Sequence, residues 1–195
     1  FTLAKKGNFF IDTLLSSDDE QIIKIAKKYK VLAPWKRPKN LCKDYTPSFK
    51  AVIHACNWYE KKFGKIDGVF ILQPTSPFRK LKTIKEMIKL FKLNKRKSVV
   101  CVSKVLEHPE WMIKIKNKKI EPYLSNKYFT KPSQKLKELY RINGLGFLVR
   151  PEVVKKQRSL IPNDTICYIN SSRIETIDID DFNDLNLARR INNNL

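Results

Sequence analysis

A short apolar stretch that ends abruptly in rigid polar residues is the feature that most constrains this sequence. Residues 69–72 (Val-Phe-Ile-Leu) form an unbroken apolar run, which is typical of a strand buried on both faces of a parallel sheet. Residues 73–79 (Gln-Pro-Thr-Ser-Pro-Phe-Arg) are mostly polar, and a helical pattern follows them. Open α/β sheets bind ligands where such a strand ends before a helix. In the alternative interpretation, the prolines only shape a loop, and Thr75 and Ser76 cap the next helix.

Strand and helix patterns alternate along the rest of the chain. The apolar patterns predict strands at residues 9–15, 31–34, 69–72, 98–102, 140–149 and 173–178. They predict helices at residues 19–29, 47–63, 83–94 and 181–191. This alternation indicates an α/β domain with a parallel sheet and helices on both faces. Residues 111–115 and 120–123 predict a hairpin inserted after the core strands.

Two helix starts carry recognisable capping chemistry. Hydroxyls and carboxylates at residues 16–20 predict the first, whose inward positions are Ile22, Ile23, Ala26 and Tyr29. Thr46 as cap and Pro47 as first helical residue predict the second.

The start of the sequence resembles the end of a helix rather than the beginning of a domain. Residues 1–6 carry basic residues before Gly7, as the last turn of a helix does. A doubly wound domain begins with a strand and a loop before its first helix. We therefore expect that this sequence lacks that strand and loop.

Length and cysteine usage bound the class of protein. With 195 residues, of which 42% are hydrophobic, one α/β domain with a sizeable core is expected. The sequence contains no apolar run long enough to span a membrane and no signal-peptide pattern. Its four cysteines are scattered and its two histidines lie far apart, which disfavours a zinc site. Free thiols in a reducing cytoplasm are the simplest interpretation.

The net charge of +21 fits nucleic acid, an anionic membrane surface or a small anionic substrate. The lysines are spread over the polar faces of helices rather than gathered in one tail, which favours a solvated lysine-rich surface. A basic nucleic-acid-binding module remains the alternative from a different functional class, although base-stacking aromatic strands are not apparent.

Two aspartates near the C-terminus have the spacing of a cation site. Asp178 and Asp180 lie two residues apart in a predicted strand, so their side chains share a face, about 6.5–7 Å apart by Cα. Such a pair could hold Mg²⁺ together with phosphate oxygens and water. The alternative is an edge strand whose carboxylates face water.

Two further groups are weaker taken alone. Arg37-Pro38, with Asp44 and Ser48 downstream, could grip a nucleotide or phosphate, or could be ordinary loop and cap residues. Residues 140–144 (Tyr-Arg-Ile-Asn-Gly) place an aromatic ring, a cation and an amide at a strand, but Asn-Gly is also a common turn. Neither the dinucleotide-binding glycine pattern nor the P-loop pattern occurs, which disfavours dinucleotide oxidoreductases and P-loop NTPases.

Several segments, in order, resemble the acylneuraminate cytidylyltransferase family. The most specific is the string Leu-Gln-Pro-Thr-Ser-Pro-Phe-Arg at residues 72–79. The others lie at residues 16–22, 37–44, 108–112, 140–144 and 177–185. Together they span nearly the whole sequence.

The resemblance implies a three-layer α/β/α, nucleotide-diphospho-sugar transferase-like (Rossmann-like) fold with a mostly parallel sheet. It implies one domain over residues 1–195 that lacks its first strand and phosphate loop, with residues 111–138 as a hairpin and dimerisation arm. The implied reaction joins CTP to a nine-carbon keto-sugar acid, giving a CMP-sugar and pyrophosphate, in a cytoplasmic homodimer that binds neither nucleic acid nor membrane. A transferase for the eight-carbon sugar acid of lipopolysaccharide is the alternative enzyme.

By position, the resemblance assigns the catalytic roles to Asp178 and Asp180, which would hold Mg²⁺, and to Gln73, which would hydrogen-bond the sugar. Mg²⁺ would offset charge on the phosphates and help to activate the sugar hydroxyl.

The resemblance also assigns binding roles. Arg37 and Ser48 would contact the cytidine part, while Tyr140 and Asn143 would line the sugar pocket. The sequence departs from the family at Ser133, where an arginine meets the sugar carboxylate in other members. Two interpretations follow: either the sugar differs from N-acetylneuraminate, with legionaminate or pseudaminate as the favoured class, or the polypeptide without its first strand and phosphate loop is inactive.

Overall fold

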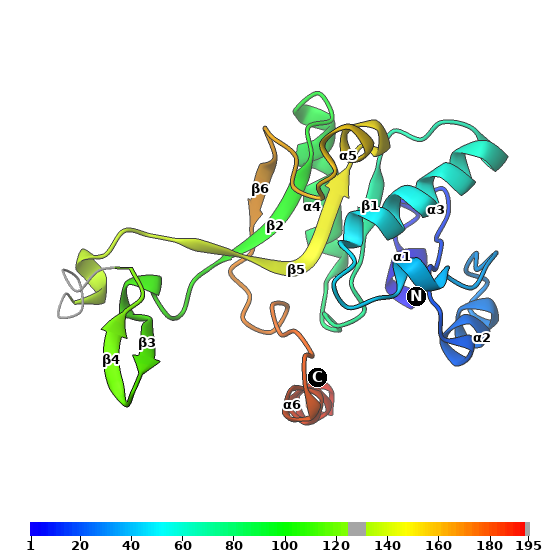
Figure 1. Cartoon of the computed structure of the whole chain (residues 1–195). Helices are drawn as coiled ribbons and strands as arrows, with labels where there is room; N and C mark the ends of the chain where they lie inside the picture. The colour runs from blue at the N-terminus through cyan, green and yellow to red at the C-terminus, as the bar shows by residue number, and fades with distance from the viewer. Residues whose placement is uncertain (125–131, 194–195) are drawn as a thin grey trace.

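Four strands form the central sheet of the computed structural model, which describes residues 1–124 and 132–193 (Figure 1). Their order across the sheet is β1 (Val69–Ile71), β5 (Tyr140–Val149), β2 (Val99–Lys104) and β6 (Ile166–Ile169). β2 pairs with β6 in parallel, and β5 runs antiparallel to both of its neighbours, β1 and β2. Three strands therefore point the same way, and the predicted mostly parallel α/β sheet is confirmed.

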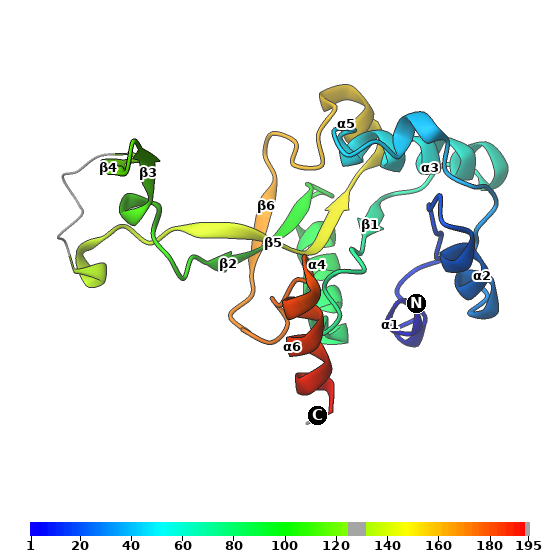
Figure 2. The same cartoon turned by 60° about the horizontal axis from the view of Figure 1, so that its bottom comes forward.

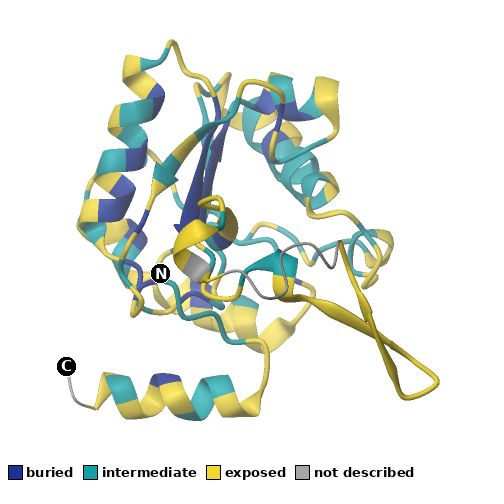
Figure 3. Cartoon of the chain, turned by 90° about the vertical axis from the view of Figure 1, so that its left-hand side faces the viewer, coloured by how far each residue is buried: buried dark blue, intermediate teal, exposed yellow. Residues whose placement is uncertain are grey.

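Successive residues of β2 pack on opposite faces of the sheet, and both faces are buried. Val99 and Cys101 pack with Met87 and Phe91 of α4 (Leu81–Leu93), whereas Val100 and Val102 pack with Phe147 in a second cluster. Figure 3 shows the sheet with helices on both sides. α4 covers one face, and α3 (Ser48–Phe63) with α5 (Pro151–Gln157) lies over the other (Figures 1 and 3). The predicted layers are therefore present.

The remaining helices are α1 (Thr2–Lys6), α2 (Glu20–Lys28) and α6 (Phe182–Asn192), with short 3₁₀ turns at Lys39–Leu41, Pro109–Trp111 and Ser133–Lys135. α6 begins with a capping box between Asp181 and Asp184. The predicted cap at Thr46 is wrong, because its hydroxyl donates to the Asn40 carbonyl and α3 begins only at Ser48.

α2 buries less than its sequence pattern predicts. Ala26 is fully buried, but Ile22 and Tyr29 are 44% and 49% exposed. Their predicted inward position is wrong because α2 lies at the edge of the molecule (Figures 1 and 2), where little chain covers it.

Three predicted strands are absent from the described residues. In residues 9–15 and 31–34 only a single bridge forms, between Leu14 and Leu32, and Ile11 is 92% exposed because no neighbouring strand covers it. Residues 173–176 form a turn instead of a strand, since Glu175 is drawn into the interior to accept hydrogen bonds from Lys80 N and Thr83 Oγ1. The fourth strand of the sheet is β6, which the sequence analysis did not predict.

The inserted hairpin projects from the body of the molecule (Figure 2). Its strands are β3 (Ile113–Lys116) and β4 (Lys119–Pro122), and all their residues are exposed. Asn117 and Lys118 form the turn with positive φ angles, as a two-residue hairpin requires. Residues 125–131 of the predicted arm lie outside the described residues. No described helix has the length and apolar content needed to cross a membrane.

The four cysteines are free thiols with very different accessibility, which makes a labelling experiment informative. Burial raises the pKa of the Cys56 and Cys101 thiols to about 11, whereas Cys167 is exposed. Because the thiolate is the reactive form, a thiol reagent at pH 8 is expected to modify Cys167 in the native protein and the two buried thiols only after unfolding. Mass spectrometry of the labelled peptides measures this, and rapid native labelling of Cys101 would contradict the packing of β2.

Candidate active site

A bulge in β5 forms the centre of the candidate site. Between Val100 and Val102 of β2, the partners on β5 run from Phe147 back to Ile142, so the intervening β5 residues loop out of the ladder. Gly144 lies in this bulge with a φ of +72°, a conformation that favours glycine. β-bulges of this kind commonly re-aim side chains next to active sites.

Three side chains from two segments of the chain surround Gly144. A Cβ atom added there would lie 2.7 Å from Gln73 Oε1, 3.3 Å from Asp178 Oδ2 and 3.5 Å from Ser76 Oγ. Gln73 and Ser76 belong to the loop after β1, and Asp178 belongs to the segment before α6. The structure therefore brings together Gln73 and Asp178, two predicted site residues that lie far apart in the sequence.

Three buried polar atoms of this cluster have no hydrogen-bond partner among the described residues: Ser76 Oγ, Asn143 Nδ2 and Asp178 Oδ1. Ser76 and Asn143 are each only 2% exposed. Asn143 Oδ1 accepts from Leu145 N at 3.2 Å, which fixes the orientation of the amide. Because unpaired buried polar groups are costly, their concentration at one point indicates a site that is completed by a ligand.

Asp178 reaches the cluster without belonging to a strand. The turn at residues 173–176 precedes it, and Ile179 N then donates to the Thr75 carbonyl at 2.9 Å. This backbone bond holds the Asp178 segment against the loop that carries Gln73. Asp180 is exposed, and its backbone amide donates to Asp184 Oδ2 at 3.0 Å.

The two aspartates are the candidate ligands for a divalent cation. The unpartnered Asp178 Oδ1 is a hard oxygen donor, and the Asp180 carboxylate follows two residues later. Within residues 1–124 and 132–193, no group of three or more His, Cys, Asp or Glu side chains could hold a metal. This donor set fits Mg²⁺, which is typically held by one or two carboxylates together with water and substrate phosphates.

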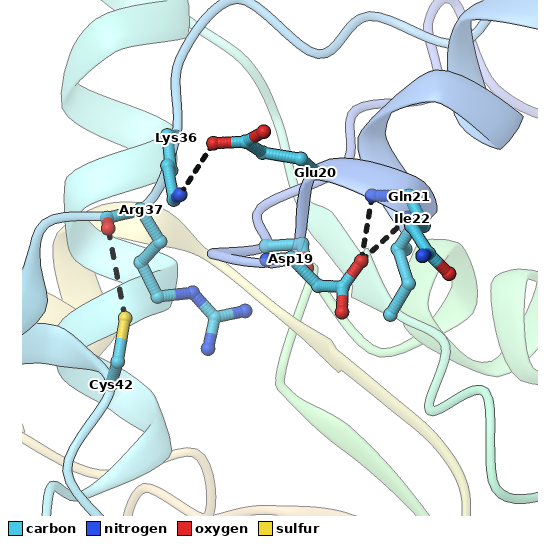
Figure 4. Close-up of polar contacts among 8 residues, drawn as sticks. Asp19, Glu20, Gln21, Ile22, Lys36, Arg37 and Cys42 are labelled. Carbon is cyan, nitrogen blue, oxygen red and sulfur yellow. Dashed lines mark hydrogen bonds and ion pairs between the residues drawn. The ribbon is translucent and has the colours of Figure 1, made fainter.

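Arg37 lies outside the Gly144 cluster, in a loop that packs against the start of α2 (Figure 4). Its Nε donates to Ser16 Oγ at 3.1 Å, its Nη2 donates to the Ser16 carbonyl, and its backbone amide donates to Ser17 O at 2.8 Å. Beside it, Lys36 forms an ion pair with Glu20 at 2.8 Å. These bonds fasten the loop at residues 34–38 to the segment before α2.

The other predicted binding residues also stand apart from the cluster. Ser48 is the exposed first residue of α3, and within the described chain no hydrogen bond or ion pair links it or Arg37 to Gln73, Asn143 or Asp178. Tyr140 pairs with Lys104 at the start of β5, four residues before Gly144. A hydrogen bond to Glu138 raises the pKa of the exposed Tyr140 hydroxyl.

Known proteins are similar in sequence to this chain over most of its length. The CMP-N,N'-diacetyllegionaminic acid synthase of Legionella pneumophila is 28% identical over 173 residues, which are 87% of this chain and 72% of that protein. A pseudaminic acid cytidylyltransferase of Campylobacter jejuni is 28% identical over 196 residues, 95% of this chain and 80% of that protein. The chain is a homologue of these cytidylyltransferases. No protein-family model matches it.

Two further comparisons extend the similarity. The N-acylneuraminate cytidylyltransferase of Escherichia coli O18:K1:H7 is 27% identical over 95% of this chain, which corresponds to 43% of that protein. The solved structure of CMP:2-keto-3-deoxy-manno-octonic acid synthetase complexed with CTP superposes with a TM-score of 0.69 and 10% identity. It covers 100% of this chain and 86% of that protein, so this nucleotidyltransferase homologue has the fold of that synthetase.

Ser76 and Arg79 belong to this site but were missed as site residues. Both lie within the most specific string of the sequence, and both are buried, at 2% and 9% exposure. A proline-flanked Ser reads as a helix cap, and an arginine before a helix reads as a surface residue. Their position in that string was the one signal that could have identified them.

Two surface cavities of about 770 and 530 Å³ lie at the opposite end of the sheet, before β1 and β2 and after β5. Arg150 and Glu152 line both. Neither contains a residue of the Gly144 cluster, so the case for the candidate site depends on the converging, unpartnered side chains rather than on cavity size.

Proposed function

We propose that this cytidylyltransferase homologue activates a nonulosonic acid with CTP. The anomeric hydroxyl of the sugar loses its proton to solvent, and its oxygen bonds to the α-phosphorus of CTP. The bond from that phosphorus to the bridging oxygen breaks, and its electron pair leaves with pyrophosphate. The products are the CMP-sugar and pyrophosphate. The observation that carries this proposal is the convergence of Gln73, Ser76 and Asp178 on Gly144, next to the buried Asn143, in a chain whose relatives are CMP-sugar synthases.

The unpartnered atoms of the cluster suit a polyhydroxylated ligand. Asn143 Nδ2 can only donate a hydrogen bond, ionised Asp178 Oδ1 can only accept one, and the Ser76 hydroxyl can do either. A sugar hydroxyl both donates and accepts, so it can satisfy these atoms together. Gln73 would add a further hydrogen bond, and Tyr140 would border the sugar from the start of β5. Arg37 and Ser48 would contact the nucleotide. This requires that bound CTP extend from the Gly144 cluster to the region of Arg37 and Ser48.

Asp178 and Asp180 would hold Mg²⁺ in this reaction. When bound, the ion would offset the charge of the phosphates and favour ionisation of the attacking hydroxyl. The chain's own contribution is to fix Asp178 through the Ile179–Thr75 backbone bond and to leave its Oδ1 atom without an internal partner.

Asp180→Asn is expected to lower turnover at least about tenfold, because it removes one anionic ligand while keeping the side-chain shape. Its exposed carboxylate makes no hydrogen bond of its own in the described structure, so the unfolding midpoint should not move. Steady-state pyrophosphate release at several Mg²⁺ concentrations measures this, with an increased Mg²⁺ requirement as the specific signature. An unchanged rate and Mg²⁺ dependence would remove Asp180 from the metal role.

Legionaminic and pseudaminic acids are the favoured substrates, since the relatives named for these sugars match the chain over most of its length. The eight-carbon keto-sugar acid is the alternative substrate, because the octonic acid synthetase has the same fold as this chain. We also propose a cytoplasmic homodimer in which residues 111–138 form the contact, a proposal supported by exposed apolar side chains on the hairpin, among them Ile115 and Ile120.

The test is a turnover assay with CTP, Mg²⁺ and a panel of nine- and eight-carbon keto-sugar acids, with CMP-sugar detected by mass spectrometry. Mg²⁺ and CTP together are also expected to raise the thermal unfolding midpoint. Turnover of the eight-carbon acid alone would favour the alternative enzyme. No turnover of any sugar acid, combined with salt-dependent binding of RNA or DNA, would overturn the proposal in favour of a nucleic-acid-binding module.

A further inference from the structure

Arg79 follows the loop that carries Gln73 and is buried next to the candidate site, with only 9% exposure, although it carries a positive charge. Its guanidinium binds two backbone carbonyls that belong to different parts of the site. Nε donates to the Leu145 carbonyl of the β5 bulge, and Nη2 donates to the Gln73 carbonyl at 3.0 Å. One side chain therefore joins the loop after β1 to the bulge that contains Gly144.

The charge of Arg79 is not neutralised by a direct ion pair. Within the described parts of the chain, no carboxylate lies at ion-pair distance from its guanidinium. Burial lowers the pKa of Arg79 to about 10, while Cys101, Asp178 and Glu175 act in the opposite direction, so the group stays protonated at neutral pH. A buried cation held mainly by neutral carbonyls is costly for stability alone, which points to a role in the site.

The contacts of Leu145 extend the influence of Arg79 to Asn143. The Leu145 carbonyl accepts from Arg79 Nε, and the Leu145 amide donates to Asn143 Oδ1 at 3.2 Å. Because Asn143 Oδ1 is fixed in this way, the orientation of its unpartnered Nδ2 is fixed as well. The guanidinium thus fixes the backbone at Gln73, from which that side chain extends, and through Leu145 the orientation of the Asn143 amide.

We propose that Arg79 is a positioning residue that sets the separation of Gln73 and Asn143 and thereby controls recognition of the sugar acid. The planar guanidinium can bind two carbonyls at once in a fixed geometry. A lysine ammonium at the same position keeps the charge but not that rigid fork. The part of this inference that concerns the sugar rests on the proposed function; the part that concerns the two carbonyls does not.

Steady-state kinetics of Arg79→Lys test the first part. The KM for the sugar acid is expected to rise about tenfold or more, with a loss in kcat, because a displacement of about 1 Å in a positioning group can cost about a hundredfold in rate. The KM for CTP should stay within about twofold. Arg150→Lys is the matched control, since Arg150 is half-buried at the opposite end of the sheet, and it should leave both KM values unchanged.

Carbonyl ¹³C chemical shifts of the ligand-free protein test the second part without any substrate. In Arg79→Lys, and in Arg79→Met if the lysine variant unfolds, the shifts of Gln73 and Leu145 are expected to change most, and the Arg150→Lys control should leave them in place. Unchanged shifts at both carbonyls would overturn the inference whatever the enzyme does. If the wild-type protein turns over no sugar acid and binds RNA or DNA instead, the proposed function fails, while the shifts still decide the role of Arg79. Altered shifts with an unchanged KM for the sugar acid, or with equal increases in both KM values, would overturn its role in sugar recognition.

Discussion

Replacing Gly144 with alanine is expected to abolish most activity and to destabilise the fold. Its φ of +72° costs a residue with a side chain about 1–2 kcal/mol. The new Cβ would also lie 2.7 Å from Gln73 Oε1, closer than real Cβ contacts, so Gln73 must move. Because Oε1 ends a flexible side chain, this movement costs little stability, so we expect the free energy of unfolding to fall by about 1–2 kcal/mol. The displacement of Gln73 is expected to lower turnover about a hundredfold. Denaturant unfolding and CMP-sugar formation measure the two effects.

Gly64→Ala provides a matched control for this variant. Gly64 ends α3 with a φ of +94°, and a Cβ added there would meet nothing within 4 Å. Its ψ of 176° places it in a region that is essentially restricted to glycine, so alanine should destabilise the fold there at least as much as at Gly144, without any effect on turnover. If Gly144→Ala lost no more activity than Gly64→Ala, the close approach of Gln73 and Asp178 to Gly144 would have no functional meaning.

Asp178→Asn is expected to lower turnover by about 10²–10³-fold while the fold remains intact. The substitution keeps the shape of the side chain and removes the negative charge that the proposed reaction needs at this point. Because Asp178 Oδ1 makes no hydrogen bond in the described structure, the free energy of unfolding should change by no more than about 1 kcal/mol. Rates of pyrophosphate release and denaturant midpoints of the same preparations measure both quantities.

The control for Asp178 is Asp164→Asn. Asp164 has a φ of +65°, which asparagine tolerates well, and it lines the cavity at the far end of the sheet. This variant should retain the wild-type rate. A rate for Asp178→Asn within about threefold of the wild type would exclude Asp178 from the chemistry.

The sequence predicts well the helices and strands whose apolar residues pack against an element that is adjacent in the chain. α4 and β2 pack against each other, and their apolar spacing reads correctly. Residues 9–15 have the same apolar character, yet Ile11 is 92% exposed, because strand formation needs a partner that no local pattern reveals. β6 was missed since alternate residues face solvent in a stretch of only four residues.

The site was predictable as a set of residues but not as a geometry. Gln73, Asn143 and Asp178 could be named from the sequence, whereas their meeting point at Gly144 depends on a bulge and on a strand that runs against its neighbours. The predicted strand at residues 173–178 was wrong because the buried Glu175 requires a turn. Asp178 nevertheless reaches the cluster through one backbone bond, from Ile179 to Thr75.

The chain leaves the core and returns to it through adjacent positions of β2 and β5. Lys104 pairs with Tyr140, and Val105 N donates to Leu139 O at 3.0 Å, so both ends of the projecting segment are anchored side by side. Changes in length or composition between these anchors therefore need not disturb the register at Gly144. In evolutionary terms, this part of the chain can vary in length without altering how the strands beside Gly144 are paired.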